Sequence, residues 1–357
     1  MDKTIKLLKD LTEANGVSGY EAPVREVAKT YFQPLGKLTT DNIGSLICTK
    51  QGLSPSPRVM LAGHMDEIGF MVRYITDEGF IKFLPLGGWF DQVLLGQRVI
   101  IHTHLGQVTG VIGVKPPHII PRDEREKVVK LKDMYIDIGA TSKKELEEAG
   151  VRIGDPIIPC ANFEILAGGK TYLSKAFDDR VGVAMMISVL QELQTEDHPN
   201  TIYAAATVME ETTLGGAKTS ADVINPDVAI ILESGIAGDV PGVLPEENSV
   251  KLGKGPVVLF YDSLMIPHLK LRNLVLDTAK ELEIPVQSDA MPGGATDGGM
   301  IHLHKTGVPT VVIGVAARHI HSHSGIIHRD DYDMTLRLVK AVIRKLDQAA
   351  VAELITH

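Results

Sequence analysis

Residues 59–69 read Val-Met-Leu-Ala-Gly-His-Met-Asp-Glu-Ile-Gly, and this stretch gives the first indication of the fold. A hydrophobic run ends at Ala62, and after one glycine the chain places His64 and Asp66 two residues apart. An open α/β sheet gathers the carboxyl ends of its strands along one edge, where ligands bind. The stretch therefore predicts a buried strand that carries an imidazole and a carboxylate at its end.

Carboxylate and imidazole groups also follow three further hydrophobic runs, and a carboxylate pair precedes a helix-like stretch. These groups are Glu210 and Glu211 after residues 201–209, Glu233 after residues 228–232, His321 shortly after residues 310–317, and Asp178 with Asp179 before an apolar stretch. Because strand ends meet at one sheet edge, they can converge in space. Two divalent ions about 3.5–4 Å apart need such a set, including a bridging carboxylate. Oxygen and nitrogen ligands without thiolate suit zinc, cobalt or manganese.

Each group also has an ordinary structural explanation. A lone pair such as His64 and Asp66 is more often a local hydrogen bond than a ligand set. Asp178 and Asp179 could simply cap the helix that follows them. Glu233 could be an exposed strand end. None of these groups identifies a site on its own.

Two features favour a site over these explanations. Glu210 and Glu211 are adjacent carboxylates after a nearly uncharged strand, so they repel each other and resist desolvation unless a cation or a solvated loop compensates. Among 13 histidines, His319, His321 and His323 alternate, so an extended chain would place all three on one face. This spacing favours a metal ligand within the triplet but does not show which histidine it is. The joint occurrence of all these groups carries the metal interpretation.

The composition excludes several other classes of protein. With 357 residues and roughly 150 per domain, two domains are expected. The formal charge of −9 argues against a nucleic-acid partner, because phosphate binding needs clustered Lys and Arg. No segment approaches the ~20 apolar residues of a membrane span, and the N-terminus has no export signal pattern. Cys48 and Cys160 fit neither a disulfide framework nor a metal motif, so the cytoplasm is the expected compartment.

Alternating strand and helix patterns predict an α/β fold, with a mixed sheet covered by helices on both faces. From residue 68 to residue 173 the pattern changes to short β-like runs separated by glycines. We therefore expect a discontinuous α/β domain, residues 1–67 and 174–357, and an inserted β-rich domain, residues 68–173, with an exposed loop at 122–132. Helices are expected at 3–14, 21–32, 142–149, 181–193, 215–222, 266–282 and 334–355. Ser18 and Glu21 fit a capping box for the second of these.

The order of the motifs resembles the tetrahedral, deblocking and glutamyl aminopeptidase family of dinuclear metallopeptidases. The resemblance covers essentially the whole chain, including the β-rich insertion. After His321 the chain reads Ser322-His323-Ser324-Gly325, which resembles a subgroup with a His-Ser-His stretch. The motifs that carry the resemblance are residues 63–69, Ala176-Phe177-Asp178-Asp179-Arg180, Glu210-Glu211 with Gly215-Gly216-Ala217, Glu233, Arg318-His319-Ile320-His321 and the glycine-rich stretch 293–299.

The resemblance implies a role for each group. Asp178 is expected to bridge two divalent ions, with His64 and Glu233 completing one site and Glu211 and His321 the other. Glu210 is expected to be the general base. Asp66 is expected to orient the His64 imidazole, and Asp179 to support Asp178. The ions are expected to be zinc, or else cobalt or manganese.

The same resemblance implies a metallo-exopeptidase-like fold, peptide substrates with a free N-terminus, and a twelve-subunit tetrahedral shell built from dimers. The PDZ-like or barrel-like insertion is expected to form the dimer contacts. The preferred N-terminal side chain stays open: a glutamyl preference needs a cation in the pocket, and a leucyl preference an apolar wall. Two rival functions also stay open. They are a deacylase for N-acyl amino acids or another co-catalytic metallohydrolase, and a non-catalytic metal-binding scaffold.

Overall fold

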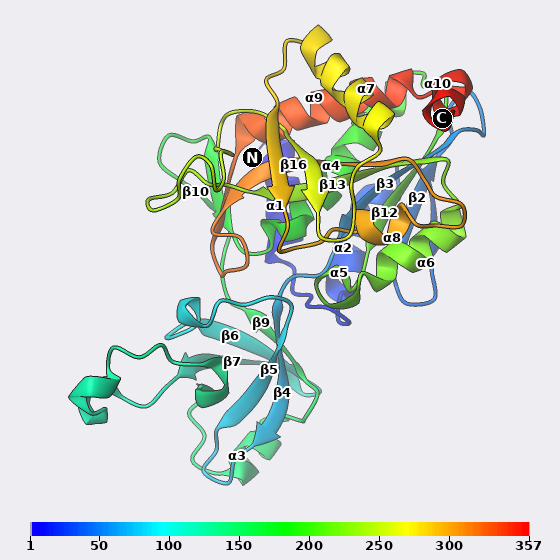
Figure 1. Cartoon of the computed structure of the whole chain (residues 1–357). Coiled ribbons are helices and arrows are strands. Elements are labelled where there is room, and N and C mark those ends of the chain that lie inside the picture. The colour runs from blue at the N-terminus through cyan, green and yellow to red at the C-terminus, as the bar shows by residue number, and fades with distance from the viewer. Residues whose placement is uncertain (1, 357) are drawn as a thin grey trace.

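The protein forms a large α/β body and a small β-barrel, which lies below the large body in Figure 1. The computed structural model describes residues 2–356, apart from the side chains of Pro117 and Glu124. The chain starts in the large body, passes through the barrel from Gly69 to Pro159, and returns to the large body. Within residues 2–356, no helix combines the length and apolar character that a membrane span requires.

The described part of the large body contains an eleven-stranded sheet in the order β1-β2-β12-β3-β13-β16-β17-β11-β10, with β14 paired to β16 and β15 to β14. Its strands are β1 (Lys37–Thr40), β2 (Leu46–Lys50), β3 (Arg58–His64), β10 (Glu164–Ile165), β11 (Thr171–Ser174), β12 (Thr201–Thr207), β13 (Val228–Ile236), β14 (Val257–Asp262), β15 (Gln287–Met291), β16 (Thr310–Arg318) and β17 (Gly325–His328). The four central strands, β12, β3, β13 and β16, run parallel, and the flanking β2 and β17 are antiparallel to them. The predicted mixed sheet is confirmed.

Helices cover both faces of this sheet. They are α1 (Lys3–Glu13), α2 (Ala22–Phe32), α4 (Phe177–Glu192), α5 (Glu210–Thr213), α6 (Gly215–Ile224), α7 (Leu269–Glu281), α8 (Gly298–Ile301), α9 (Arg329–Lys345) and α10 (Gln348–Leu354). Because successive strand residues point to opposite faces, Val59 and Leu61 of β3 pack in one core, and Met60 and Ala62 pack in the other. Burial on both faces explains why β3 reads as one continuous hydrophobic run.

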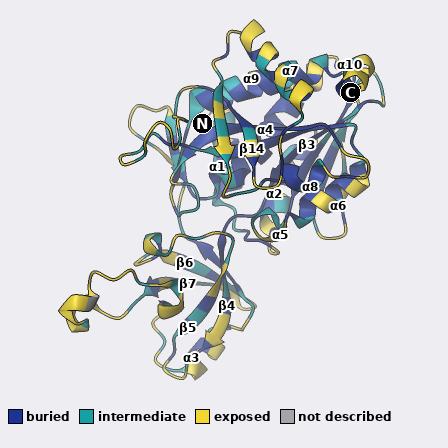
Figure 2. Cartoon of the chain, in the orientation of Figure 1, coloured by how far each residue is buried: buried dark blue, intermediate teal, exposed yellow. Residues whose placement is uncertain are grey.

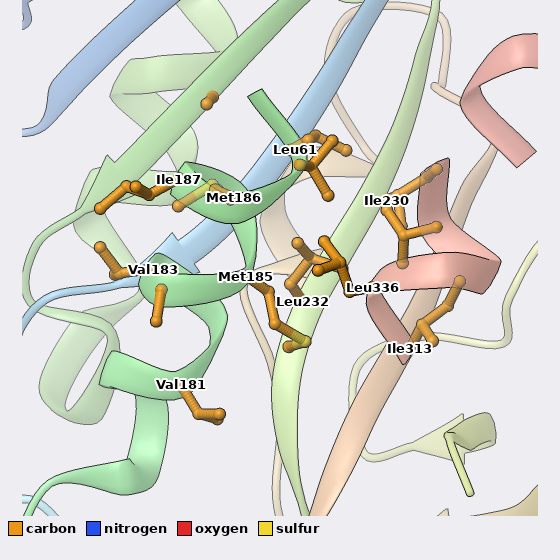
Figure 3. Close-up of a cluster of buried hydrophobic side chains, with 14 of the residues drawn as sticks. Leu61, Val181, Val183, Met185, Met186, Ile187, Ile230, Leu232, Ile313 and Leu336 are labelled. Carbon is orange, nitrogen blue, oxygen red and sulfur yellow. The ribbon is translucent and has the colours of Figure 1, made fainter. Parts of the chain in front are cut away.

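Helix α4 is buried over most of its length and begins near the end of β3. It packs against β3 and β13, and from Val181 to Leu190 its residues are buried. Figure 3 shows Met185 of α4 beside Leu232 of the sheet. Figure 2 shows the centre of the large body as buried. This core therefore holds α4 against β3 and β13.

The barrel closes in the order β4-β5-β8-β7-β6-β9. Its elements are β4 (Gly69–Ile75), β5 (Ile81–Leu86), β6 (Arg98–Thr103), β7 (Gly106–Gly113), β8 (Tyr135–Asp137), β9 (Pro156–Pro159) and the helix α3 (Lys143–Glu148). The predicted loop at 122–132 is exposed and extends from the barrel in Figure 2. Strand β10 and all but the last residue of β11 fall within the expected insertion, residues 68–173, but β11 pairs with β17 of the large sheet.

Two local predictions are wrong. The helix expected at 334–355 is two helices, because α9 ends at Lys345 and Asp347 caps α10 by accepting a hydrogen bond from the Ala350 amide at 2.7 Å. The capping box at Ser18 does not form. Glu21 instead accepts hydrogen bonds from the amides of Gly19 and Met209. Ser18 donates to Asp66, so this turn supports the strand end at β3 and not the helix α2.

Candidate metal centre

The sequence of each strand end places its polar groups at one edge of the parallel strands. His64 is the last residue of β3 and lies opposite Thr207, the last residue of β12. Glu210 and Glu211 begin α5, three residues further on. Glu233 lies within β13, which pairs with β16 beside it, and His321 follows β16. With Asp178 in the first turn of α4, the groups expected from the sequence meet at this edge.

His64 lies among three carboxylates. Its Nε2 atom is 3.1 Å from Asp178 Oδ1, 3.8 Å from Glu210 Oε2 and 4.0 Å from Glu233 Oε1. Its other ring nitrogen, Nδ1, donates to the backbone carbonyl of Asp66 at 2.9 Å. A neutral His64 therefore directs the lone pair of Nε2 at the carboxylates.

His321 repeats this arrangement from another element. Its Nε2 atom is 3.2 Å from Asp178 Oδ2 and 3.3 Å from Glu211 Oε1. Its Nδ1 atom donates to the backbone carbonyl of Gly88 at 2.7 Å. Asp178 thus presents one oxygen to each histidine and lies between the two clusters.

The donor set fits divalent cations. Each neutral imidazole aims a lone pair at carboxylate oxygens, and two lone pairs repel unless a proton or a cation lies between them. Imidazole and carboxylate donors without thiolate are the ligands of zinc, cobalt and manganese sites. Two groups of three donor atoms lie within 4.8 Å of one another, one from His64, Glu210 and Glu233 and the other from His64, Asp178 and Glu211.

The shifted pKa values of the site also favour a bound cation. Burial raises the pKa of Glu210 well above its ordinary value, and the Glu233 and Asp297 carboxylates add to the increase although His64 opposes it. Burial, with Asp179 adding to it, likewise raises the pKa of Glu233. Burial alone lowers the pKa of His64, yet Glu210 and the other surrounding carboxylates raise it well above its usual value. Without a cation the site therefore retains protons that compensate for the crowded carboxylates.

Asp66 is fully buried and holds both sides of the site in place. Its carboxylate accepts hydrogen bonds from the backbone amides of Glu210 at 3.0 Å and Glu211 at 3.1 Å, and from Ser18. A carboxylate oxygen lies 3.5 Å from His64 Nδ1. The predicted contact with His64 is therefore made chiefly by the Asp66 carbonyl, while the side chain fixes the first turn of α5.

Asp179 supports the site through its neighbours. Its carboxylate accepts from the His64 amide at 3.1 Å and from the Gly182 amide at 3.0 Å. The peptide bond between Asp178 and Asp179 is cis. Asp179 therefore connects the start of α4 to the end of β3, and Asp178 remains free to face both histidines.

The three alternating histidines do not share one face. The chain turns after β16, with positive φ at His319 and His321, so the extended geometry that the spacing suggested is absent at these residues. His319 is exposed, and His323 is buried against the ring of Trp89. Of the three, only His321 joins the cluster around Asp178.

Two contributors were not identified from the sequence. Asp297, in the glycine-rich stretch 293–299, is buried, accepts a hydrogen bond from Thr207 Oγ1 at 2.5 Å, and has a pKa that burial raises to about 6. The only sequence feature that pointed to Asp297 was its position in this glycine-rich motif. Gly88 contributes a backbone carbonyl from the barrel. A pattern of side chains in the sequence cannot predict a contact made by a backbone carbonyl.

The site opens into a cavity of about 850 Å³. His64, Asp178, Glu210, Glu211, Glu233 and His321 line one part of it, and residues from several other segments, among them 212–214 and 290–296, line the rest. The volume lies within the range of small-molecule and cofactor sites. The donor groups are therefore open to this cavity.

Comparison with known proteins identifies the family. Residues 44–338 match the family described as M42 glutamyl aminopeptidase. The chain belongs to this M42 family. A shorter match, to a family described as AMPT, covers residues 2–27. The family resemblance, the peptide hydrolase class and metal-dependent aminopeptidase activity are thereby confirmed.

Curated M42 relatives match along almost their whole length. Glutamyl aminopeptidase from Lactococcus lactis subsp. cremoris is 36% identical over 97% of this chain and 98% of its own. Lysyl aminopeptidase from Pyrococcus furiosus is 32% identical over 96% of this chain and 97% of its own. The two names differ in the residue removed, so membership of the family does not show which N-terminal side chain this chain prefers.

Solved structures have the same fold. The TET aminopeptidase from the marine sediment archaeon Thaumarchaeota archaeon SCGC AB-539-E09 is 47% identical and covers 99% of each chain, with a TM-score of 0.97. The Pyrococcus horikoshii TET1 peptidase is 32% identical over 96% of this chain and 100% of its own, with a TM-score of 0.87. That peptidase can assemble into a tetrahedron or a large octahedral shell.

Proposed function

We propose that this M42 aminopeptidase removes the first residue of peptides at a centre of two divalent ions that share Asp178. In this proposal His64 and Glu233 complete one site, and Glu211 and His321 complete the other. The observation that carries it is the placement of Asp178, whose two carboxylate oxygens lie 3.1 Å and 3.2 Å from the Nε2 atoms of the two histidines. Zinc is the preferred ion, with cobalt or manganese as the alternatives.

Glu210 is the proposed general base. Such a pair of ions, when bound, lowers the pKa of a water molecule and polarises the scissile carbonyl. Glu210 lines the cavity beside His64 and can accept the proton of the attacking water. Its raised pKa suits a group that takes up a proton and then delivers it to the departing amine. Asp66 acts as a positioning residue, because it holds the amide of Glu210.

The cavity favours a free N-terminus with a neutral side chain. The carboxylates around His64 attract a peptide ammonium group. None of the described residues that line the cavity is Lys or Arg, so a glutamyl side chain would lack a cationic partner there. The wall instead presents apolar side chains, namely Leu214, Ile236, Leu264, Met291, Met300 and Ile320. We therefore propose apolar residues such as leucine or methionine as the preferred first residue.

The proposed assembly is a homo-oligomer, as in the TET relatives, built into a twelve-subunit shell. We propose residues 69–159 as the inserted domain that forms dimer contacts, because β10 and β11 pair within the large sheet. The proposed compartment is the cytoplasm, which suits the free thiols of Cys48 and Cys160.

A substrate panel tests this proposal. We expect the metal-loaded protein to hydrolyse leucyl- and methionyl-p-nitroanilide with a kcat/KM at least tenfold above that for the glutamyl and lysyl substrates. N-acetylleucyl-p-nitroanilide is the matched control, and it should not be cleaved. Release of acetate from N-acetylleucine, without release of p-nitroaniline from the free-amine substrates, would indicate the rival deacylase. A glutamyl preference would contradict the proposed pocket.

A further inference from the structure

A loop of the barrel reaches the metal centre of the large body. The loop joins β5 to the short 3-10 helix η1 (Asp91–Val93). Its Gly88 carbonyl accepts the hydrogen bond from His321 Nδ1 at 2.7 Å, and Gly88 lines the cavity. A carbonyl oxygen can only accept, so this contact fixes the proton of a neutral His321 on Nδ1. The lone pair of Nε2 then faces Asp178 and Glu211.

The loop approaches the centre so closely that added side-chain atoms would crowd it. A Cβ atom added at Gly88 would lie 3.2 Å from His321 Nδ1. A Cβ at Gly87 would lie 3.1 Å from Glu211 Oε2 and 2.4 Å from Ile68 Cγ2. Gly87 also has a φ of 84°, in the left-handed region that favours glycine. Both glycines therefore contact the half of the centre that contains Glu211 and His321.

Trp89 anchors the loop in the barrel. Its indole Nε1 donates to the Gly69 carbonyl at 3.0 Å, and its ring stacks on Phe70 with centroids 4.7 Å apart. The Trp89 ring also lies 5.4 Å from that of His323, two residues beyond His321. The loop is thus held by β4 of the barrel and by the turn that carries His321.

We propose that residues Gly87, Gly88 and Trp89 form a positioning segment for the second metal site. The segment orients His321 and packs on Glu211, so the barrel is part of the active centre as well as a separate folded body. This inference rests on the proposed function, in which His321 and Glu211 hold the second ion. Groups that orient metal-ligating histidines typically change metal affinity by 10–100-fold when they are altered.

The substitution Gly88→Ala tests the segment directly. Gly88 has no positive φ, so alanine should change mainly the space beside His321. We expect zinc affinity at the second site to fall by roughly 10–100-fold, while the first site keeps its affinity. Zinc retained per subunit in zinc-buffered solutions measures both sites. At subsaturating zinc kcat should fall, and KM should change less than kcat.

Two comparisons separate a specific effect from general damage. Gly110→Ala places a Cβ 2.6 Å from Ile136 Cγ2 inside the barrel and away from the centre, so it should leave zinc affinity unchanged. Trp89→Phe keeps a ring on Phe70 but removes the donor to Gly69, so it should weaken the second site less than Gly88→Ala does. Circular dichroism and thermal unfolding check that each variant is folded.

A double-mutant cycle with His321→Ala gives the decisive result. Because Gly88 acts through His321 in this proposal, Gly88→Ala should weaken zinc binding no further when His321 is absent. Equal weakening in both backgrounds would overturn the inference, as would Gly88→Ala protein that binds both ions as tightly as the wild type. Wild-type protein that binds no second ion would instead overturn the proposed function.

Discussion

In this centre, residues that face the cavity are held in position by buried carboxylates. Asp66 is fully buried, yet it determines where Glu210 begins α5, because its carboxylate accepts the Glu210 and Glu211 amides. The Asp179 carboxylate likewise holds the backbone of His64, whose amide donates to it. Buried carboxylates that accept backbone hydrogen bonds fix geometry without contacting substrate.

At this scale the clearest prediction concerns Glu210. The substitution Glu210→Gln keeps the size of the side chain but removes its basicity, so kcat should fall by roughly 10²–10⁴-fold. The variant should still bind two equivalents of zinc. Steady-state kinetics and metal analysis measure these effects, with Glu78→Gln, an exposed barrel residue that does not line the cavity, as the control. Near-wild-type turnover of Glu210→Gln would refute its assignment as the base.

The sequence could assemble the candidate residues but could not give their contacts. Strand ends place His64, Glu210 and Glu233 at one edge through a general property of parallel sheets. The choice among the alternating histidines depended on a turn with positive φ at His319 and His321, which spacing alone does not reveal. The contact of Gly88 with His321 spans 233 positions and uses a backbone atom.

Among the elements, α1, β3 and α4 are joined by a buried ionic cluster behind the metal centre. Glu67 Oε1 pairs with Lys175 Nζ at 2.5 Å and with Arg180 at 3.2 Å. Arg180 also donates to the backbone carbonyls of Leu11 and Ala14 at the end of α1, and to that of Met65. Burial lowers the pKa of Lys175 to about 8, although Glu67 opposes the decrease.

Loss of one partner in this cluster should destabilise the large body strongly. The substitution Glu67→Ala leaves two buried cations without their carboxylate, and such losses cost about 3–5 kcal/mol. We expect the Tm of the metal-free protein to fall by roughly 5 °C or more. Differential scanning calorimetry measures the change, and Glu78→Ala on the exposed barrel surface is the control. An unchanged Tm would show that the cluster contributes nothing to stability.

Element predictions succeeded where one hydrophobic period continued over many residues. The continuous apolar run of β3 and the long pattern of α4 gave correct elements, because burial on both sides demands apolar residues throughout. The break between α9 and α10 was missed, because the apolar spacing continues across Leu346, which is itself buried. Strands β10 and β11 were assigned to the insertion, because short strands do not reveal which sheet they join.

For the whole molecule, proton and metal binding oppose each other. Burial and neighbouring carboxylates raise the pKa of Glu210 and Glu233, so the folded metal-free protein keeps protons that the unfolded chain releases above about pH 4.5. Burial alone would lower the pKa of His321, but Asp178 and Glu211 raise it to about 11, which acts in the same direction above about pH 6.5. The contribution of these three groups to the stability of the metal-free protein should therefore fall as the pH rises.

Divalent ions take the place of these protons, so metal affinity should rise with pH. We expect the difference in Tm between zinc-loaded and chelator-treated protein to grow from about pH 6 to about pH 8. Thermal unfolding with and without EDTA at each pH measures it. A difference that shrinks over this range would contradict the assignment of His64 and His321 as ligands.

The central claim is that Asp178 bridges two ions, and anomalous X-ray diffraction from zinc-loaded crystals tests it most directly. Data collected on both sides of the zinc absorption edge should give two peaks per subunit. We predict one peak in contact with His64, Asp178 and Glu233, and the other in contact with Asp178, Glu211 and His321. A single peak, or two peaks that do not share Asp178, would contradict the account.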